Sequence, residues 1–388
     1  MKTNSLNQPL EGLKVIEMAA LGPVPFCSMM LADMGADVVR IDRSGSAGLG
    51  FQMDNRFDMT SRGHRSVSLD LRCSQGVEVA LKLIESADVL LEGMRPGAME
   101  RLGLGPEPCM QRNAALIYGR MTGWGQSGPM SNRAGHDINY ISMNGVLHSI
   151  GLTDGPPVPP LNLVGDYGGG AMFLVTGVLA ALHETRQSGK GQIIDAAMME
   201  GASYLMSPIH SFRNAGLWQS ERGSNLLDSG APYYRVYETR DARHMAVGAI
   251  EPKFYKLFVE GLGLDLSGLP DPMDQQNWAT LIEEFTAVFM SKTLEQWSDI
   301  FLPIDACVTP VLTIEESINF EHNCERNSFV TIDGQVQPNL SPRFSRTKVM
   351  VESTPIKPGQ HSKEILKELE ISESEIDGLY KHGVVSDS

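Results

Sequence analysis

The first 120 residues alternate between short apolar runs and segments with helical spacing. Residues 25–35 and 75–86 show the helical pattern, and each lies between two apolar runs. The expected strands are residues 13–18, 36–42, 67–71, 88–92 and 114–119. Strands that alternate with helices predict βαβ units and a parallel sheet. We therefore expect an α/β fold whose larger part is a Rossmann-like parallel-sheet domain.

The pattern changes in the second half of the chain. Apolar helices are expected over residues 169–186 and 200–218, followed by a polar, turn-rich stretch. Two β-strands and two helices then follow without the βαβ rhythm, which indicates a smaller α+β domain. Two closing helices are expected at the end. The expected layout is a large domain over 1–200 and 325–388, a small domain over 232–311, and linkers over 201–231 and 312–324.

Charge and cysteine content narrow the possible partners and compartments. The net charge of −15 argues against a nucleic-acid partner, although a few local arginines suffice for a small anion. Five scattered cysteines show no zinc-ligand spacing, so no metal is expected and a reducing, cytoplasmic location is favoured. Neither a signal-peptide core, an apolar run of membrane-spanning length nor a peroxisomal C-terminal tripeptide is expected.

Two short segments carry the candidate chemistry. Residues 135–140 place His136 where a helix is expected to begin, and residues 162–170 place Asp166 just before a run of glycines. An imidazole and a carboxylate that face each other can remove a proton from one side of a carbon and return one to the other. The alternatives are a partly buried His136 bonded to a carbonyl and an Asp166 that caps the following helix. Taken alone, Glu251 is a surface or capping residue before Pro252.

Two arginines are candidates for binding phosphate. Arg40 is expected to end a strand and Arg95 to follow one, where ligands of α/β sheets gather, and a guanidinium can clamp phosphate with two parallel bonds. The alternative for each is an ion pair, with Asp42 or Glu92. Residues 123–128 fit G-x-G-x-x-G, but Pro129 follows at once and no helix is expected there, so a dinucleotide site is not predicted. The chain has 21 methionines, and core filling is expected of Met121, Met130, Met143 and Met198.

These segments together resemble a known family. Residues 31–40 and 92–97 are similar to the CoA-contact regions of the family III CoA-transferases. Further segments resemble the α-methylacyl-CoA racemases within that family; they are residues 135–140, 165–166, 225–234, 249–255 and 305–311. One departure is Ser61-Arg62-Gly63-His64-Arg65, where many members have an Asn-Arg-Gly-Lys type sequence. This departure bears on adenine recognition.

The resemblance implies a reaction and a role for each site residue. It implies that (R)- and (S)-2-methylacyl-CoA thioesters are interconverted through an enolate, with His136 and Asp166 as the two bases and Glu251 paired with the histidine. We expect the Asp137 backbone N–H to hold the thioester oxygen, because a helix N-terminus favours negative charge. The remaining expected roles are pocket groups for Tyr140 and Asn162 and CoA contacts for Arg40 and Arg95.

The resemblance also implies an interlocked homodimer that shares each site between subunits. No cofactor is implied, since CoA is part of the substrate. The acyl group stays open between a branched fatty acid, a sterol side chain and an arylpropionate. Two other functions remain: a CoA-transferase that uses Asp166 as a nucleophile through a mixed anhydride, and an acyl-CoA-binding protein without catalysis.

Overall fold

The chain folds into two compact units. The computed structural model describes residues 7–44, 53–349, 351 and 353–387. Unit 1 comprises residues 1–144, 161–205 and 322–388, and unit 2 comprises residues 145–160 and 206–321. The stretch 145–160 therefore groups with unit 2, although no boundary was expected there from the sequence. The domain limits expected from the sequence stay a prediction.

Unit 1 is built on a seven-stranded sheet in the order β12-β3-β2-β1-β4-β5-β6. Neighbouring strands are parallel except for β12, which runs antiparallel to β3. The strands are β1 (Lys14–Met18), β2 (Asp37–Arg43), β3 (His64–Leu69), β4 (Val89–Glu92), β5 (Ile117–Thr122), β6 (Ile193–Ala197) and β12 (Val385–Ser386). All five strands predicted for the first 120 residues are present, and the predicted parallel sheet is confirmed.

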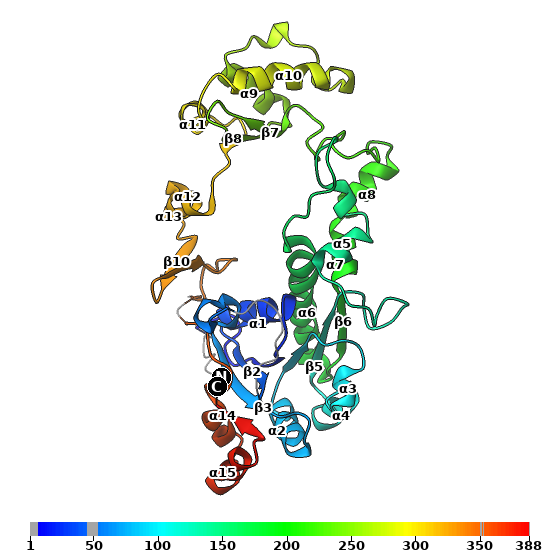
Figure 1. Ribbon diagram of the computed structural model, residues 1–388, viewed down its shortest axis with the longest axis vertical. Coiled ribbons are helices and arrows are strands. Elements are labelled where there is room, and N and C mark those ends of the chain that lie inside the picture. Colours follow the sequence, from blue (N-terminus) through cyan, green and yellow to red (C-terminus); the bar gives the residue numbers. More distant parts are fainter. Residues whose placement is uncertain (1–6, 45–52, 350, 352, 388) are drawn as a thin grey trace. The chain divides into compact units, whose positions relative to one another are not determined.

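Helices cover both faces of this sheet (Figure 1). Consecutive residues of a strand point to opposite faces, so Val15 enters one core and Ile16 the other. The first core is shared with α1 (Pro23–Asp33) and α6 (Met172–Ser188). The second core is shared with α2 (Ser74–Glu85), α3 (Ala98–Arg101), α4 (Pro106–Arg112), α14 (Ser362–Glu368) and α15 (Glu373–Lys381). A hairpin of β10 (Phe329–Ile332) and β11 (Gln335–Pro338) also belongs to unit 1.

The helix predicted for residues 169–186 begins earlier than expected. It starts as the π-helix η4 (Leu163–Ala171) and continues without interruption as α6. Its first N–H groups are bonded by Asp137, a residue distant in sequence, which no local pattern could reveal. The single helix predicted over 200–218 is instead α7 (Met198–Leu205) and α8 (Ser207–Asn214). Pro208 in the first turn of α8 explains the break, because proline cannot donate to the preceding turn.

The expectation that no apolar segment approaches membrane-spanning length is wrong. The continuous helix Leu163–Ser188 has 26 residues and is apolar enough to cross a membrane by length and composition. In the fold it packs on the sheet through Leu174, Val175 and Val178. Only 39% of its most apolar window is buried within the chain. A core helix of a soluble fold passes the same test, so this single helix is weak evidence for a membrane span.

Unit 2 has an antiparallel sheet in the order β7-β8-β9. The strands are β7 (Tyr234–Glu238), β8 (His244–Gly248) and β9 (Val308–Pro310). Three helices enclose an aromatic core that includes Phe258, Phe285, Phe289 and Trp297. They are α9 (Pro252–Leu262), α10 (Trp278–Phe289) and α11 (Leu294–Phe301). α12 (Ile314–Asn319) follows in the same unit, and residues 322–325 of α13 (Glu321–Glu325) already belong to unit 1. The smaller α+β arrangement predicted for this part of the chain is present.

Candidate active site

The site is organised by a reversal of strand order at the carboxyl edge of the large sheet. β1 pairs with β2 on one side and with β4 on the other, so the connections that follow these strands diverge at this edge. The segments after β1 and β4 meet there: a Cβ added at Gly93 would lie 3.3 Å from the Ala20 Cβ. Open α/β sheets bind ligands at such a switch point.

The Asp166 carboxylate lies at this edge, in the first turn of η4. Its Oδ2 accepts a hydrogen bond from Asn162 Nδ2 at 3.1 Å. The other close neighbour is Gly22, at the start of α1, where an added Cβ would lie 3.4 Å from Oδ2. Gly22 has a φ of 74°, which L side chains rarely adopt, so the space beside the carboxylate stays open. Asp166 is half-buried, and no side chain projects towards its carboxylate from position 22.

The short helix α5 (Asp137–Ser142) presents His136 next to this carboxylate. His136 is the N-cap residue, and its backbone N–H donates to Asn139 Oδ1 at 3.1 Å. The residue is exposed, so the alternative of a partly buried histidine is wrong. The next residue, Asp137, accepts the Asp166 N–H at 2.8 Å, so the segments that carry His136 and Asp166 lie side by side. The structure thus brings together the two predicted bases, which are thirty positions apart in the sequence.

Asp137 joins the two segments that carry the bases. Its carboxylate is buried, and Oδ2 accepts the Gly165 N–H at 2.6 Å and the Asp166 N–H at 2.8 Å. The backbone of α5 is thereby fixed to the backbone of η4. The predicted helix start at Asp137 is confirmed. The residue begins α5, while its side-chain carboxylate bonds the backbone of η4.

The environment changes the acidity of both Asp166 and Tyr140. Burial raises the pKa of Asp166, the Asn162 amide opposes this, and the Asp137 charge raises it further. Burial also raises the pKa of Tyr140 to about 12, with a contribution from Asp166, while Arg95 acts in the opposite direction. These mutual effects place Tyr140, Asp166 and Arg95 in one electrostatic environment.

Tyr140 supports the loop that precedes His136. Its hydroxyl donates to the Gly135 carbonyl, and its ring contacts Trp124 edge-on with centroids 4.9 Å apart. A Cβ added at Gly123 would lie 2.0 Å from the tyrosine ring, and one at Gly135 would lie 2.7 Å from it. Glycine is required at both positions because the ring occupies that space. The G-x-G segment therefore makes room for Tyr140, and the prediction that it opens no helix is confirmed.

The two predicted arginines differ in their surroundings. Arg95 is exposed after β4, and its alternative partner Glu92 is bonded instead to Arg120 at 2.8 Å. Arg40 is buried inside β2, where its Nε donates to Asp42 at 2.9 Å. The expectation that Arg40 ends a strand is wrong, since β2 continues to Arg43.

A cavity of about 370 Å³ opens at the same edge, at the ends of β1, β2 and β3. Arg43 and Met94 are among the residues that line it, and Arg95 follows Met94 directly. Sequence reasoning missed Arg43, although a basic residue at the end of a predicted strand is the signal that could have found it. Arg43 is exposed, so its guanidinium is accessible to a ligand.

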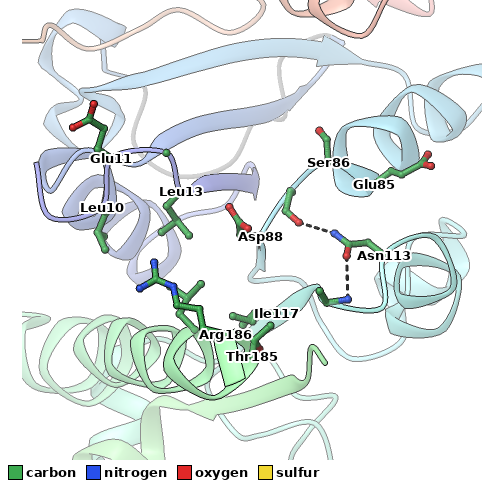
Figure 2. A pocket seen from close by; sticks show the side chains of 14 residues that line it. Leu10, Glu11, Leu13, Glu85, Ser86, Asp88, Asn113, Ile117, Thr185 and Arg186 are labelled. Carbon is green, nitrogen blue, oxygen red and sulfur yellow. Dashed lines mark hydrogen bonds between the residues drawn. The ribbon is translucent and has the colours of Figure 1, made fainter. Parts of the chain in front are cut away.

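A second cavity lies at the opposite edge of the sheet. It measures about 480 Å³, and Figure 2 shows Leu13, Asp88, Ile117 and Arg186 at its walls. Asn113 bridges the chain there by donating to the Ala87 carbonyl and accepting the Ala115 N–H. This cavity is at the amino-terminal ends of the strands and contains none of the predicted site residues.

Glu251 belongs to unit 2 and not to the unit that carries the bases. It is the exposed N-cap residue of α9, as the sequence predicts from Pro252. Its pairing with His136 stays a prediction. Of the methionines expected in the core, Met121 and Met198 are buried, but Met143 is 64% exposed, which corrects that expectation.

The family of the chain follows from its fold, its site and its sequence. Residues 10–362 match the sequence profile of CoA-transferase family III, and the chain belongs to that family. A Brucella suis CAIB/BAIF family protein has the same fold, with a TM-score of 0.80, 23% identity and coverage of 94% of this chain and 100% of that one.

Relatives within the family are closer in sequence. The chain is 48% identical to the alpha-methylacyl-CoA racemase of Mus musculus, over 97% of both proteins. It is 45% identical to the alpha-methylacyl-CoA racemase of Homo sapiens, over 95% of both. The resemblance drawn from the separate motifs is thereby confirmed over nearly the whole chain.

Proposed function

We propose that this protein interconverts the two α-epimers of 2-methylacyl-CoA thioesters. The observation that carries the proposal is the close approach of the segments that bear His136 and Asp166, at the switch point of the sheet. Their segments are joined by the Asp137 carboxylate, and Gly22 keeps open the space beside Asp166. The similarity to two racemases over almost the entire length supports the same reaction.

In the proposed reaction, one base takes the α-proton and the electrons of the C–H bond form an enolate. The conjugate acid of the other base then donates a proton to the opposite face. His136 serves one enantiomer and Asp166 the other. The raised pKa of Asp166 suits this double use, because it makes the carboxylate a stronger base and increases the fraction of the carboxyl that carries a proton to return.

The enolate oxygen needs donors, because a thioester α-proton is far less acidic than the conjugate acid of either base. We propose the backbone N–H of Asp137 for this contact, since the first N–H groups of a helix have no acceptor within it. Arg95 and the neighbouring Arg43 are proposed to bind the phosphates of CoA along the cavity at the strand ends. Arg40, which is already paired with Asp42, supports that wall from within.

We further propose a homodimer in which Glu251 orients His136. Support comes from apolar surface that the single chain leaves uncovered, including Leu161 at 75% and Tyr204 at 71% exposure, together with the partly buried helix Leu163–Ser188. A second copy of the chain is the proposed cover, because monomers rarely expose large contiguous apolar patches. Sedimentation at micromolar concentration should then give twice the chain mass.

The test follows α-proton exchange in D₂O, starting separately from the (R)- and (S)-2-methylacyl-CoA thioester. The unmodified protein should introduce deuterium from both. His136→Ala should slow proton removal from one enantiomer, and Asp166→Asn should slow it from the other, each by about a hundredfold or more. His210→Ala, an exposed histidine of α8, is the matched control.

Two results would overturn the racemase proposal. The first is inversion without deuterium uptake. The second is trapping of an acyl group on Asp166 by hydroxylamine together with a need for a carboxylic acid acceptor, which would identify a CoA-transferase.

A further inference from the structure

We infer that the Asp137 carboxylate is a positioning group that holds the second base, Asp166, in register with the thioester oxygen. This inference rests on the proposed function, in which the backbone N–H of the same residue contacts that oxygen. One residue would then fix both the oxygen and the base, so that the distance between them does not depend on the loops in between.

The contacts of Asp137 differ from those of an ordinary helix cap. The N-cap residue of η4 is Asn162, and its side chain makes no capping bond. Its amide is directed instead to the Asp166 carboxylate. The N–H groups of Gly165 and Asp166 are bonded by Asp137, which lies 28 and 29 positions earlier in the chain. A local cap would satisfy these donors without connecting the two bases.

These two hydrogen bonds to Asp137, here called the Asp137 clamp, also constrain Gly165. A Cβ added at Gly165 would lie 2.6 Å from Asp137 Oδ2 and 3.3 Å from the Asp137 Cα. Any side chain at position 165 would therefore push the two backbones apart. The close approach needs glycine at this position, although Gly165 itself carries no reactive group.

The second oxygen of the carboxylate is the feature that a capping role leaves unexplained. Asp137 is 4% exposed, and its Oδ1 is buried without a hydrogen-bond partner among the described residues. An asparagine could accept both N–H groups without a buried charge, which is costly to desolvate. Burial raises the pKa of Asp166 and the Asn162 hydrogen bond lowers it. The two charged groups that act on this pKa, Asp137 raising it and His136 lowering it, are neighbours at the start of α5. The charge at 137 therefore acts on the base as well as on its backbone.

The test measures α-proton exchange from each enantiomer in Asp137→Asn and in Gly165→Ala. The enantiomer that depends on Asp166 is first identified with Asp166→Asn. Asp137→Asn should slow exchange from that enantiomer by about tenfold to a hundredfold and move the acid limb of its pH profile to lower pH. Gly165→Ala, which keeps the charge but displaces the clamp, should slow the same enantiomer. Asp195→Asn is the matched control. That carboxylate also accepts a backbone N–H, from Gln126 at 3.1 Å, but among the described residues it makes no hydrogen bond to η4 or α5.

The double variant Asp137→Asn with Asp166→Asn should be no slower than Asp166→Asn alone, because a positioning group acts only through the base. Thermal unfolding reports whether each variant is folded. If Asp137→Asn does not fold, Gly165→Ala still tests the inference. Equal slowing of both enantiomers by Asp137→Asn with an unchanged pH profile would overturn the inference. If Asp166→Asn and His136→Ala themselves spare both enantiomers, the proposed function fails instead.

Discussion

The side-chain amide of Asn162 donates to the Asp166 carboxylate over 3.1 Å, and this hydrogen bond opposes the rise in pKa that burial causes at that carboxyl. Burial and the Asp137 charge both raise the pKa of Asp166, and the Asn162 bond acts against them. A hydrogen bond to the charged form of an acid favours that form. The acidity of the proposed base is therefore a balance between Asn162 on one side and its buried location on the other.

Replacing Asn162 should move the pH dependence of the reaction. In Asn162→Ala the donor is lost, so the pKa of Asp166 rises and a larger fraction of the carboxyl is protonated at a given acid pH. The acid limb of proton exchange from the Asp166-dependent enantiomer should shift to higher pH, in the direction opposite to Asp137→Asn. The same exchange assay over a pH series measures this. Asn319→Ala, which removes an exposed amide of α12, should leave the limb in place.

Removing the Tyr140 hydroxyl should disturb the other base. Tyr140→Phe deletes the donor to the Gly135 carbonyl, directly before His136, while the ring still fills the space beside Gly123. We expect a loss of about 1 kcal/mol in the free energy of unfolding and slower exchange from the enantiomer that depends on His136. Urea unfolding and the exchange assay measure the two effects. Equal rates for both enantiomers at wild-type level would contradict the supporting role of this tyrosine.

Arg95 should affect substrate binding more than the chemical step. It is exposed at the switch point with its neighbour Glu92 committed to Arg120, so its guanidinium is available to phosphate. Arg95→Ala should raise KM for the acyl-CoA by about tenfold or more, with a small change in kcat. Steady-state kinetics measure both constants. Arg186→Ala is the control, because this exposed arginine lines the cavity at the opposite edge of the sheet (Figure 2). A similar rise in KM for both variants would refute the assignment.

His64, which stands in the segment that departs from the Asn-Arg-Gly-Lys type sequence, should contribute to the free energy of unfolding. His64 is buried with Nε2 3.1 Å from Glu17 Oε2, and Ser28 donates to the same oxygen at 2.7 Å. Burial raises the pKa of Glu17, but His64 and Arg40 outweigh it and hold the pKa below its ordinary value. His64→Ala would leave a buried carboxylate without its main partner and should cost about 3–5 kcal/mol of unfolding free energy. Urea titration measures this loss, and a change below about 1 kcal/mol would refute the pairing.

The same pair should make stability depend on acid pH. Because the folded-state pKa of Glu17 is depressed, its contribution is present above the unfolded-state value of about 4.3 and is lost as the pH falls through the folded value. In His64→Ala this part of the acid sensitivity should shrink. Unfolding midpoints recorded from neutral pH downwards test the sign.

Much of unit 1 could be predicted because its signals are local. Apolar runs of four to seven residues alternate with amphipathic segments, and burying them requires a parallel sheet with helices on both faces. The expected helix start at Asp137 is likewise a local property, since it depends on the residues of that turn. The π-helix was missed because its first donors bond Asp137, a partner that no neighbouring residue reveals.

By itself, the sequence determined the strand-helix alternation, the family and the choice of His136 and Asp166 as proposed bases, since each depends on residue type and spacing along the chain. Only the tertiary structure decided that Arg40 is committed to Asp42 while Arg95 is exposed at the switch point, and that Asp137 connects the segments of His136 and Asp166. The physical reason is that hydrogen-bond partners and burial are set by which distant segments meet. A carboxylate or guanidinium has the same formula in either setting, but desolvation and neighbouring charge give it a different chemistry.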